Sequence, residues 1–378
     1  MDNYFDLLNP SRSATQFVSK SALSQARKNL SQTTFIDLNQ RAIKIYYENH
    51  PRLKTWHGHR LCAIDGSKIR LPNSEAIVNE FGVTTGKEGS RECPMALASV
   101  YYDVLNHLTI DSSINPTRAS ERECAASHLE FAQPGDLSIL DRGYNAFWLY
   151  ALYDKASSHF CMRAKVNLGL QFKAFAQSGA AEKIITMKPN RVAMEKCLEK
   201  GLSTKPLRLR LVRVELDNEV EVLITNLLDN ERYPAREFKA LYHLRWGVEE
   251  NYKRLKMWVE LENFSGKSVL SVKQDFYARV LSSNLVAMMA NTAQRLIDRH
   301  KKGRRLLYQI NFAQAISKMK NTLVELILLS SERLKKRLTE LIRYIACTLE
   351  PVRPNRSYDR KVCKTNGRAF SMNYKRAK

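Results

Sequence analysis

The chain has 378 residues, of which 44% are hydrophobic; this is enough for two or three domains and excludes wholesale disorder. Lysine and arginine number 61 against 38 aspartate and glutamate, so the formal net charge is +23 at pH 7. This excess favours polyanionic partners, because they release condensed counterions on binding. We therefore expect a nucleic-acid-binding protein, with a ribosome-associated or simply basic soluble protein as the alternative.

The seven cysteines are dispersed and form no Cys-x-x-Cys pair. This spacing argues against a disulfide framework and a zinc ribbon, and it is typical of reduced thiols in a cytoplasmic protein. Residues 1–9 contain Asp2 and Asp6 but no basic segment, so no signal peptide is expected. No apolar run approaches 18 residues, so the sequence predicts neither a membrane span nor a membrane partner.

The first part of the chain is predicted to be helical. Between residues 14 and 50, Ala22, Leu23, Ala26 and Leu30 recur at helical spacing after possible caps at Ser19 and Ser21. Lysine and arginine occupy the other side of this helix. We interpret residues 1–55 as an N-terminal helical DNA-binding region; an element that only packs against the rest of the protein is the open alternative.

From residue 60 the pattern changes to short buried strands with helices between them. Three strands come first, then a helix opened near Thr117 or Ser120, a strand, a second helix and a last strand. This order predicts three antiparallel strands followed by right-handed crossovers to parallel ones, as in a ribonuclease-H-like α/β core. The expected strands are 61–64, 95–103, 107–114, 137–140 and 159–165, and the second helix is 145–156.

The stretch 166–235 interrupts this pattern and is predicted to be a β-rich insertion. Its clearest element is a hairpin in which alternating leucines at 207–211 lead through a turn at 217–218 into Val220, Val222 and Ile224. Helices at 236–258 and 268–300 then resume the core. The predicted domains are the helical region 1–55, core parts 56–165 and 236–300, the insertion 166–235 and a basic C-terminal region 301–378.

That C-terminal region contains the basic run Lys301–Arg305, an amphipathic helix around 310–348 and a basic tail. Tyr358, Phe370 and Tyr374 are interleaved with the cations of the tail, which suits backbone contact and base stacking. A disordered, solubilising tail is the alternative. The predicted fold is thus a mixed sheet flanked by helices, interrupted by the insertion, with helical N- and C-terminal regions.

One predicted helix concentrates chemistry on a single face. Tyr242, Arg245, Glu249 and Lys256 fall at intervals of 3, 4 and 7, which places their side chains within about 60° of one another around a helix. A carboxylate, two cations and a phenol on one stripe suit a metal ion and a phosphodiester. Glu250 lies about 100° off this stripe and is expected to be exposed.

Two aspartates upstream complete a possible metal site. Asp65 and Asp141 each end a short apolar run, so the carboxyl ends of parallel strands would bring them to one edge of the sheet, within reach of Glu249. Two or three carboxylates suffice for Mg²⁺, which keeps several of its waters. Asp111 is a further acid, which we expect to face solvent. Gly266-Lys267-Ser268 lacks the upstream glycines of a P-loop, so no nucleotide cofactor is predicted.

These segments resemble the acidic motifs of the DDE transposases. Asp65-Gly66-Ser67, Asp141-Arg142-Gly143-Tyr144 and the Tyr242, Arg245, Glu249 and Lys256 series are similar to those of the bacterial insertion-sequence-four family with its Tyr-Arg-Glu-Lys signature. The resemblance runs from about Phe17 to Lys256. It implies a ribonuclease-H-like catalytic domain with a β-rich insertion between the second Asp and the Glu.

The resemblance also implies roles for individual residues. Asp65, Asp141 and Glu249 would bind two Mg²⁺ ions, with Mn²⁺ as a substitute, and Tyr242, Arg245 and Lys256 would hold DNA phosphates. The expected activity is cleavage at terminal inverted repeats and strand transfer into target DNA by a homodimer. A ribonuclease-H-like nuclease without strand transfer, or an inactive transposase-derived DNA-binding protein, remains the alternative. The short 1–55 region leaves a truncated N-terminal domain open.

Overall fold

The structure is a computed structural model that describes residues 19–50, 53–84, 92–165, 169–216, 220–299 and 306–353. The predicted basic run Lys301–Arg305, the hairpin turn at 217–218 and the aromatic residues of the tail lie outside the described residues. The described part of the chain forms two compact units, and each unit is described by itself. The first draws on Met1–Glu48, Arg70–Pro94 and Arg254–Lys378, and the second on Asn49–Ile69 and Met95–Lys253.

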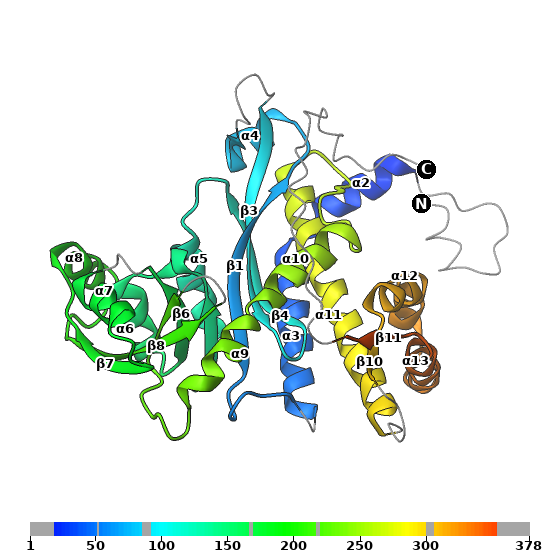
Figure 1. Ribbon diagram of the computed structural model, residues 1–378. Coiled ribbons are helices and arrows are strands. Elements are labelled where there is room, and N and C mark those ends of the chain that lie inside the picture. Colours follow the sequence, from blue (N-terminus) through cyan, green and yellow to red (C-terminus); the bar gives the residue numbers. More distant parts are fainter. Residues whose placement is uncertain are drawn as a thin grey trace, which may run out of the picture. The chain divides into compact units, whose positions relative to one another are not determined.

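Most of one mixed sheet lies in the second unit; Figure 1 labels most of its strands. Among the described residues it has nine strands, in the order β2-β3-β1-β5-β6-β9-β8-β7, with β4 also paired to β3. In chain order they are β1 (Leu61–Arg70), β2 (Val83–Thr84), β3 (Cys93–Asp103), β4 (Leu108–Pro116), β5 (Leu137–Leu140), β6 (His159–Ala164), β7 (Glu182–Met187), β8 (Leu207–Glu215) and β9 (Val220–Thr225).

Strand directions follow the predicted plan. β3 and β4 are antiparallel, whereas β1, β5 and β6 run parallel to one another. Parallel strands need crossovers, and helices provide them between β4 and β5 and between β5 and β6. The mixed sheet with flanking helices confirms the predicted ribonuclease-H-like fold class. The helices of this unit are α5 (Glu121–His128), η1 (Leu129–Phe131), η2 (Arg142–Tyr144), α6 (Phe147–Lys155), α7 (Leu170–Gln177), α8 (Arg191–Glu199), η4 (Ala235–Glu237), α9 (Phe238–His243) and the start of α10 (Trp246–Met257).

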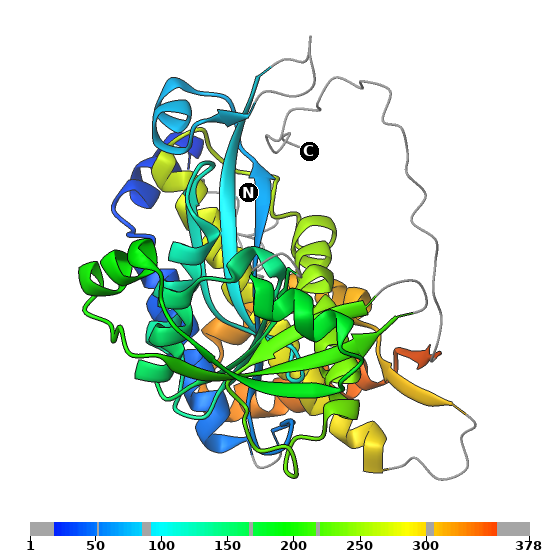
Figure 2. The same cartoon turned by 60° about the vertical axis from the view of Figure 1, so that its left-hand side comes forward.

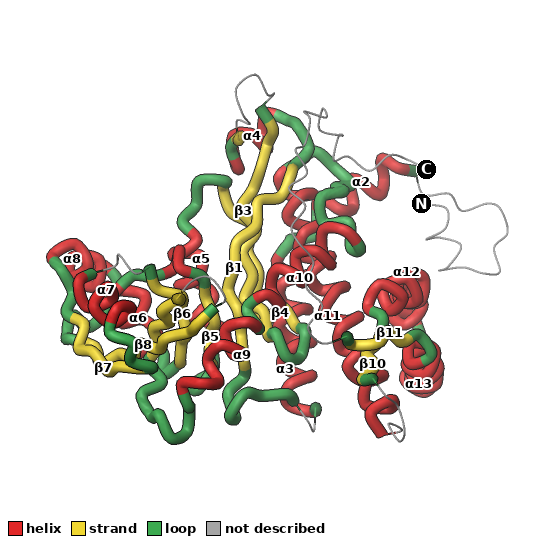
Figure 3. The backbone as a smooth tube through the Cα atoms, in the orientation of Figure 1, coloured by secondary structure: helices red, strands yellow, loops and turns green. Residues whose placement is uncertain are grey.

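Residues between 169 and 225 continue the same sheet rather than forming a separate one. β9, β8 and β7 add antiparallel strands beside β6 (Figure 2). The predicted hairpin is present as β8 paired with β9. Helices α7 and α8 alternate with these strands in the tube drawing (Figure 3). The limits of the insertion, like the other domain limits, stay predictions.

Alternation along the strands sorts their side chains onto two faces. Cys62 and Ile64 of β1 belong to a buried cluster with residues of α5, α6, α7 and α8, so these helices cover one face. Asp65 therefore points to the other face. Tyr242 of α9 and Tyr252 of α10 reach main-chain oxygens from that side, at Leu140 and Asp65 respectively. The sheet thus carries its core helices on one face and the Glu249 helix on the other.

The predicted single helix over 236–258 is wrong, because α9 ends at His243 and α10 begins at Trp246. The main-chain N–H groups of Leu244 and Arg245 bond carbonyls three residues back, at 3.1 Å each, which tightens the chain into a turn. Tyr242 and Glu249 consequently lie on two short helices with Arg245 in the turn between them.

The first unit is mainly helical. Three of its helices, α11, α12 and α13, contact one another, and a two-stranded sheet of β10 and β11 lies beside them in the chain. The predicted helix 268–300 is confirmed as α11. The predicted single helix 310–348 is wrong, because α12 ends at Leu328 and α13 begins at Ser331. The elements are α2 (Lys20–Lys28), α3 (Thr33–Asn49), α4 (Glu75–Phe81), α11 (Val269–Arg299), β10 (Leu307–Ile310), α12 (Phe312–Leu328), α13 (Ser331–Ala346) and β11 (Leu349–Val352).

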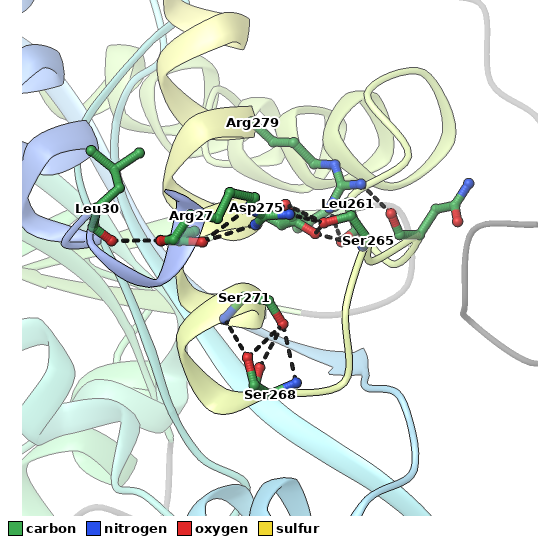
Figure 4. A network of polar contacts seen from close by, with 10 residues as sticks. Arg27, Leu30, Leu261, Ser265, Ser268, Ser271, Asp275 and Arg279 are labelled. Atoms are coloured by element: carbon green, nitrogen blue, oxygen red, sulfur yellow. Dashed lines mark hydrogen bonds and ion pairs between the residues drawn. The ribbon is translucent and has the colours of Figure 1, made fainter. Parts of the chain in front are cut away.

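A polar network joins α2 to α11 within this unit (Figure 4). The guanidinium of Arg27 donates to Gln274, Asp275 and Ser265 at 2.5 to 3.1 Å. Gln274 in return donates to the main-chain oxygens of Arg27 and Leu30, at 2.8 and 2.5 Å. Because Gln274 takes up two carbonyls at the C-terminal end of α2, the helix end is satisfied by its neighbour. No helix among the described residues has the length and apolarity to cross a membrane.

Candidate active site

Asp65 lies inside β1 rather than at its end, because the strand continues to Arg70. The pairing of β1 with β5 reaches only Ala63, which lies opposite Ile139. Two residues further along the same register, Asp65 is level with Asp141. Neighbouring strands are about 4.8 Å apart, so the two aspartates leave the sheet side by side on one face.

Asp141 follows β5 directly and begins the short helix η2. One carboxylate oxygen, Oδ1, accepts the main-chain N–H of Arg142 at 2.6 Å and lies 3.2 Å from the guanidinium of Arg163 on β6. Arg163 also pairs with Glu221 of β9, so one cation serves two carboxylates. The Asp141 side chain is 38% exposed and therefore accessible to a ligand.

Glu249 stands in the first turn of α10 and is held by Arg245. The guanidinium nitrogen Nη2 of Arg245 lies 2.8 Å from Oε1 of Glu249. The hydroxyl of Tyr242 donates to the main-chain oxygen of Leu140 at 3.3 Å, one residue before Asp141. Tyr242, Arg245 and Glu249 are therefore together, as the stripe predicts, although the helix that carries them is broken.

The carboxylates act on one another electrostatically. Burial raises the pKa of Asp65 to about 6, and the negative charges of Glu121 and Glu249 add to this, against the N–H of Gly66 and the charge of Arg245. A carboxyl group in a poorly solvated site with like charges resists ionisation. Asp65 and Glu249 thus repel each other, and Arg245 interacts with both of them and with Asp141. A bound cation would relieve this repulsion.

Glu121 is an acid of this site that the sequence did not single out. It is the first residue of α5, and its pKa is raised by burial and then by the charge of Asp141. Its Oε1 lies only 3.1 Å from the position that a Cβ on Gly66 would take, so Gly66 leaves room for it. In the sequence, Glu121 looks like an ordinary acid in the first turn of a helix, where the helix dipole favours negative charge.

Lys256, the fourth residue of the predicted stripe, is in the last turn of α10 and belongs to the first unit. Its ammonium lies 3.9 Å from a carboxylate oxygen of Glu262. Burial lowers its pKa, and the charge of Glu262 opposes that effect. Its role as a phosphate contact stays a prediction.

Two other predictions about acids have opposite outcomes. Glu250 is exposed and pairs with Lys253 at 2.7 Å, which confirms the prediction. The prediction that Asp111 faces solvent is wrong, because its carboxylate lies 2.6 Å from Nδ1 of the fully buried His128.

The donor chemistry suits Mg²⁺, but the side-chain positions are those of a protein without the ion. Among the described residues, no three His, Cys, Asp or Glu side chains are arranged to hold a metal ion as they stand. Gly66, Arg142 and Arg245 instead donate to oxygens of the three predicted acids. These hard oxygens fit a divalent cation, provided that the side chains turn and Arg245 releases Glu249.

The family model described as "Transposase DDE domain" matches residues 56–285, more than half of the chain. The chain therefore belongs to this family of DDE transposases, as the three acidic motifs predict. The matched segment includes Asp65, Asp141, Glu249 and Lys256.

The chain is also similar to two curated transposases. It is 24% identical over 286 residues to "Transposase InsG for insertion sequence element IS4" of Escherichia coli, covering 75% of this chain and 63% of the relative. It is 28% identical over 163 residues to "Putative transposase y4zB" of Sinorhizobium fredii, covering 42% of this chain and 44% of that relative. The chain thus spans less than two thirds of the length of each.

A solved structure of a piggyBac transposase synaptic complex with hairpin DNA aligns with a TM-score of 0.43 and 9% identity, over 76% of this chain and 57% of that one.

Proposed function

We propose that the protein is the transposase of an insertion sequence, which nicks DNA at the terminal inverted repeats of its element and joins the resulting 3′-hydroxyls to target DNA. The observation that carries this proposal is the shared field of Asp65, Glu249 and Asp141, with Arg245 among them. These groups lie within the segment that matches the DDE family.

Asp65, Asp141 and Glu249 would hold two Mg²⁺ or Mn²⁺ ions. Such ions neutralise charge on a phosphodiester and activate the attacking oxygen. The acids of this chain favour them for a physical reason: burial raises the pKa of Asp65 to about 6, and the negative charges of Glu121 and Glu249 contribute to this rise. A divalent cation removes that repulsion.

Arg245 would change partner when DNA arrives. In the protein alone its guanidinium neutralises Glu249 at 2.8 Å. Once a divalent ion takes the carboxylate, the guanidinium is available to bind a phosphate with two parallel hydrogen bonds. Tyr242 would donate its hydroxyl to the same backbone and Lys256 would supply a point charge. This exchange links metal binding to DNA binding.

The remaining partners follow from charge and stoichiometry. The net charge of +23 suits both the transposon ends and the target DNA. Two ends have to be held together for transposition, so a homodimer on DNA is proposed, with the C-terminal helices α12 and α13 as the candidate interface.

The test compares two adjacent acids on α10. Glu249→Gln keeps the shape of the side chain but removes its charge, and end cleavage with Mg²⁺ or Mn²⁺ should fall about 1000-fold or more, since metal ions supply several kcal/mol. The matched control Glu250→Gln alters an exposed acid that pairs with Lys253 and should cleave normally. Both variants should bind DNA. Undiminished cleavage by the Glu249 variant would disprove the metal assignment.

The same assay separates the alternatives. With target plasmid present, a transposase joins the cleaved ends to it, whereas a nuclease without strand transfer leaves free ends. A wild-type protein that binds the ends but does not cut them with either ion is an inactive transposase derivative.

A further inference from the structure

Two buried hydroxyl groups face the main-chain carbonyl oxygen of Asp65. Tyr252, on α10 less than a turn after Glu249, shares its hydroxyl proton between this oxygen, at 3.0 Å, and the carbonyl oxygen of Ala98, at 2.8 Å. Ser99 on β3 approaches the same Asp65 oxygen with its Oγ at 3.5 Å. Tyr252 is 5% exposed and Ser99 is fully buried, so water does not compete for these hydrogen bonds.

The Ser99 hydroxyl is itself held by a buried imidazole. Nε2 of His128 lies 2.9 Å from Ser99 Oγ, and Nδ1 lies 2.6 Å from a carboxylate oxygen of Asp111. Because an ionised carboxylate only accepts, Nδ1 of His128 donates, and this fixes the orientation of the ring. In the neutral ring Nε2 then accepts from Ser99, so the single hydroxyl proton of Ser99 has two acceptors, Nε2 at 2.9 Å and the Asp65 oxygen at 3.5 Å, of which Nε2 is the nearer. A continuous chain of hydrogen bonds therefore runs from β4 through α5 to β3.

Aspartate, histidine and serine in this sequence of contacts form the pattern of a hydrolase triad. Here Ser99 and His128 have no exposed surface, so no substrate reaches the hydroxyl. Its neighbour is instead the main chain at Asp65, which indicates a positioning role.

The main chain needs support at this point. The ladder of β1 with β5 ends at Ala63, so Asp65 has no β5 partner beside it. The next residue, Gly66, has no side chain that could anchor the strand. β1 keeps β3 as its neighbour on the other edge. Metal ligands have to be held within about 0.5 Å to bind well, so a strand that is paired on only one edge beside a ligand is a weak point.

We propose that these four side chains form a buried brace that fixes the Asp65 main chain and ties it to the helix of Glu249. The Asp65 brace consists of Ser99, Asp111, His128 and Tyr252. Its members are positioning residues, since they act through Asp65. The inference rests on the proposed function, because Asp65 has to bind a cation for its position to matter.

The experiment measures binding of Mn²⁺ alone to the full chain, by the magnetic resonance signal of the free ion. Tyr252→Phe removes one hydroxyl and should weaken Mn²⁺ binding about tenfold, at the low end of the range for groups that orient metal ligands. Metal-free DNA binding should not change. Tyr101→Phe is the matched control: it removes a buried hydroxyl that donates to Asp136 at 3.1 Å, and it should leave Mn²⁺ affinity unchanged.

If Tyr252→Phe folds poorly, Ser99→Ala provides a second test of the same proposal. Ser99→Ala removes the other hydroxyl group that contacts the Asp65 oxygen, and His128→Gln breaks the chain of hydrogen bonds that holds Ser99. If His128 acts through Ser99, His128→Gln adds nothing once Ser99 is lost. The double variant Ser99→Ala with His128→Gln should then bind Mn²⁺ no more weakly than Ser99→Ala alone.

The outcomes distinguish the two proposals. A wild-type protein that binds no Mn²⁺ refutes the proposed function, and the role of the brace with it. A wild-type protein that binds Mn²⁺ with the same affinity as both Tyr252→Phe and Ser99→Ala refutes only the brace. Equal loss of affinity in Tyr101→Phe would show general destabilisation and would also refute it.

Discussion

Strand β5 has an aspartate at each end, and the two have different surroundings. Asp136, just before the strand, is 3% exposed and lies against Arg60, which donates to both of its carboxylate oxygens. The hydroxyl of Tyr101 and the main-chain N–H of Gln133 donate to it as well, at 3.1 and 2.8 Å. Asp141, just after the strand, shares the cation Arg163 with Glu221.

The difference between the two ends of β5 shows that the Asp136 end stabilises the fold, whereas the Asp141 end does so less. At the Asp136 end, every negative charge has a dedicated donor, as in an ordinary structural ion pair. At the Asp141 end, Asp65, Glu121 and Glu249 add like charges, and burial together with these charges raises the pKa of Asp65 to about 6. A fold gains nothing by collecting repelling carboxylates, so such a place is a candidate for function.

Asp136→Asn tests the structural end and should have the largest effect on folding. It leaves the Arg60 guanidinium buried without its counter-charge, and the side chain of Arg60 is only 10% exposed. Loss of one partner of a buried pair costs about 3–5 kcal/mol of unfolding free energy. Denaturant unfolding of the full chain measures this loss; a change below about 1 kcal/mol, the value of an exposed pair, would contradict the comparison.

Asp141→Asn makes the same substitution at the other end of β5. It should reduce DNA cleavage and not the stability of the fold. The unfolding free energy should stay the same or rise, because a repelling charge is removed. End cleavage should fall about 1000-fold, since a metal ligand is lost. A variant that cleaves normally but unfolds easily would show that the two ends of β5 have the opposite roles.

The core strands and two of the acids could be predicted because they depend on local pattern. Apolar runs before Asp65 and Asp141 mark strands whatever the rest of the chain does. The continuation of β1 past Asp65 was not predictable in this way, because Lys68 and Arg70 make that half of the strand look like a loop. The break between α9 and α10 was missed for a similar reason: Leu244 and Arg245 are good helix formers.

The acids that were missed or misjudged depend on distant partners. Asp111 alternates with apolar residues as a solvent-facing residue does, and its buried partner His128 lies 17 residues further along the chain. Glu121 joins the site because Gly66 leaves space beside it. Such contacts are set by the packing of α5 against the sheet, which no local pattern records.

Glu121→Gln should shift the pH dependence of metal binding. Asp65 has to be ionised to bind a cation, and its ionised fraction falls as the pH drops through about 6. The charge of Glu121 raises the Asp65 pKa, so its removal lowers that pKa and moves the acid limb of Mn²⁺ binding to lower pH. Titration of Mn²⁺ binding against pH measures the shift.

The matched control is Glu123→Gln, because Glu123 lies in the same turn of α5 but pairs with Lys200 at 2.6 Å. Its pH profile should be that of the wild type. An acid limb that stays in place while Mn²⁺ affinity falls at every pH would make Glu121 a metal ligand rather than a charge that tunes Asp65.

Lys256→Gln should have the smallest effect and tests how far the site extends along α10. A single phosphate contact contributes about one unit to the slope of log affinity against log salt, so DNA binding should weaken for all sequences and the slope should decrease by about one. Lys253→Gln is the control, since that lysine is 66% exposed and pairs with Glu250. Burial lowers the pKa of Lys256, and a carboxylate oxygen of Glu262 lies 3.9 Å from its ammonium. The ammonium can therefore pair either with Glu262 or with a DNA phosphate. An unchanged salt slope would assign Lys256 to the protein's own ion pair and leave Arg245 and Tyr242 as the phosphate contacts.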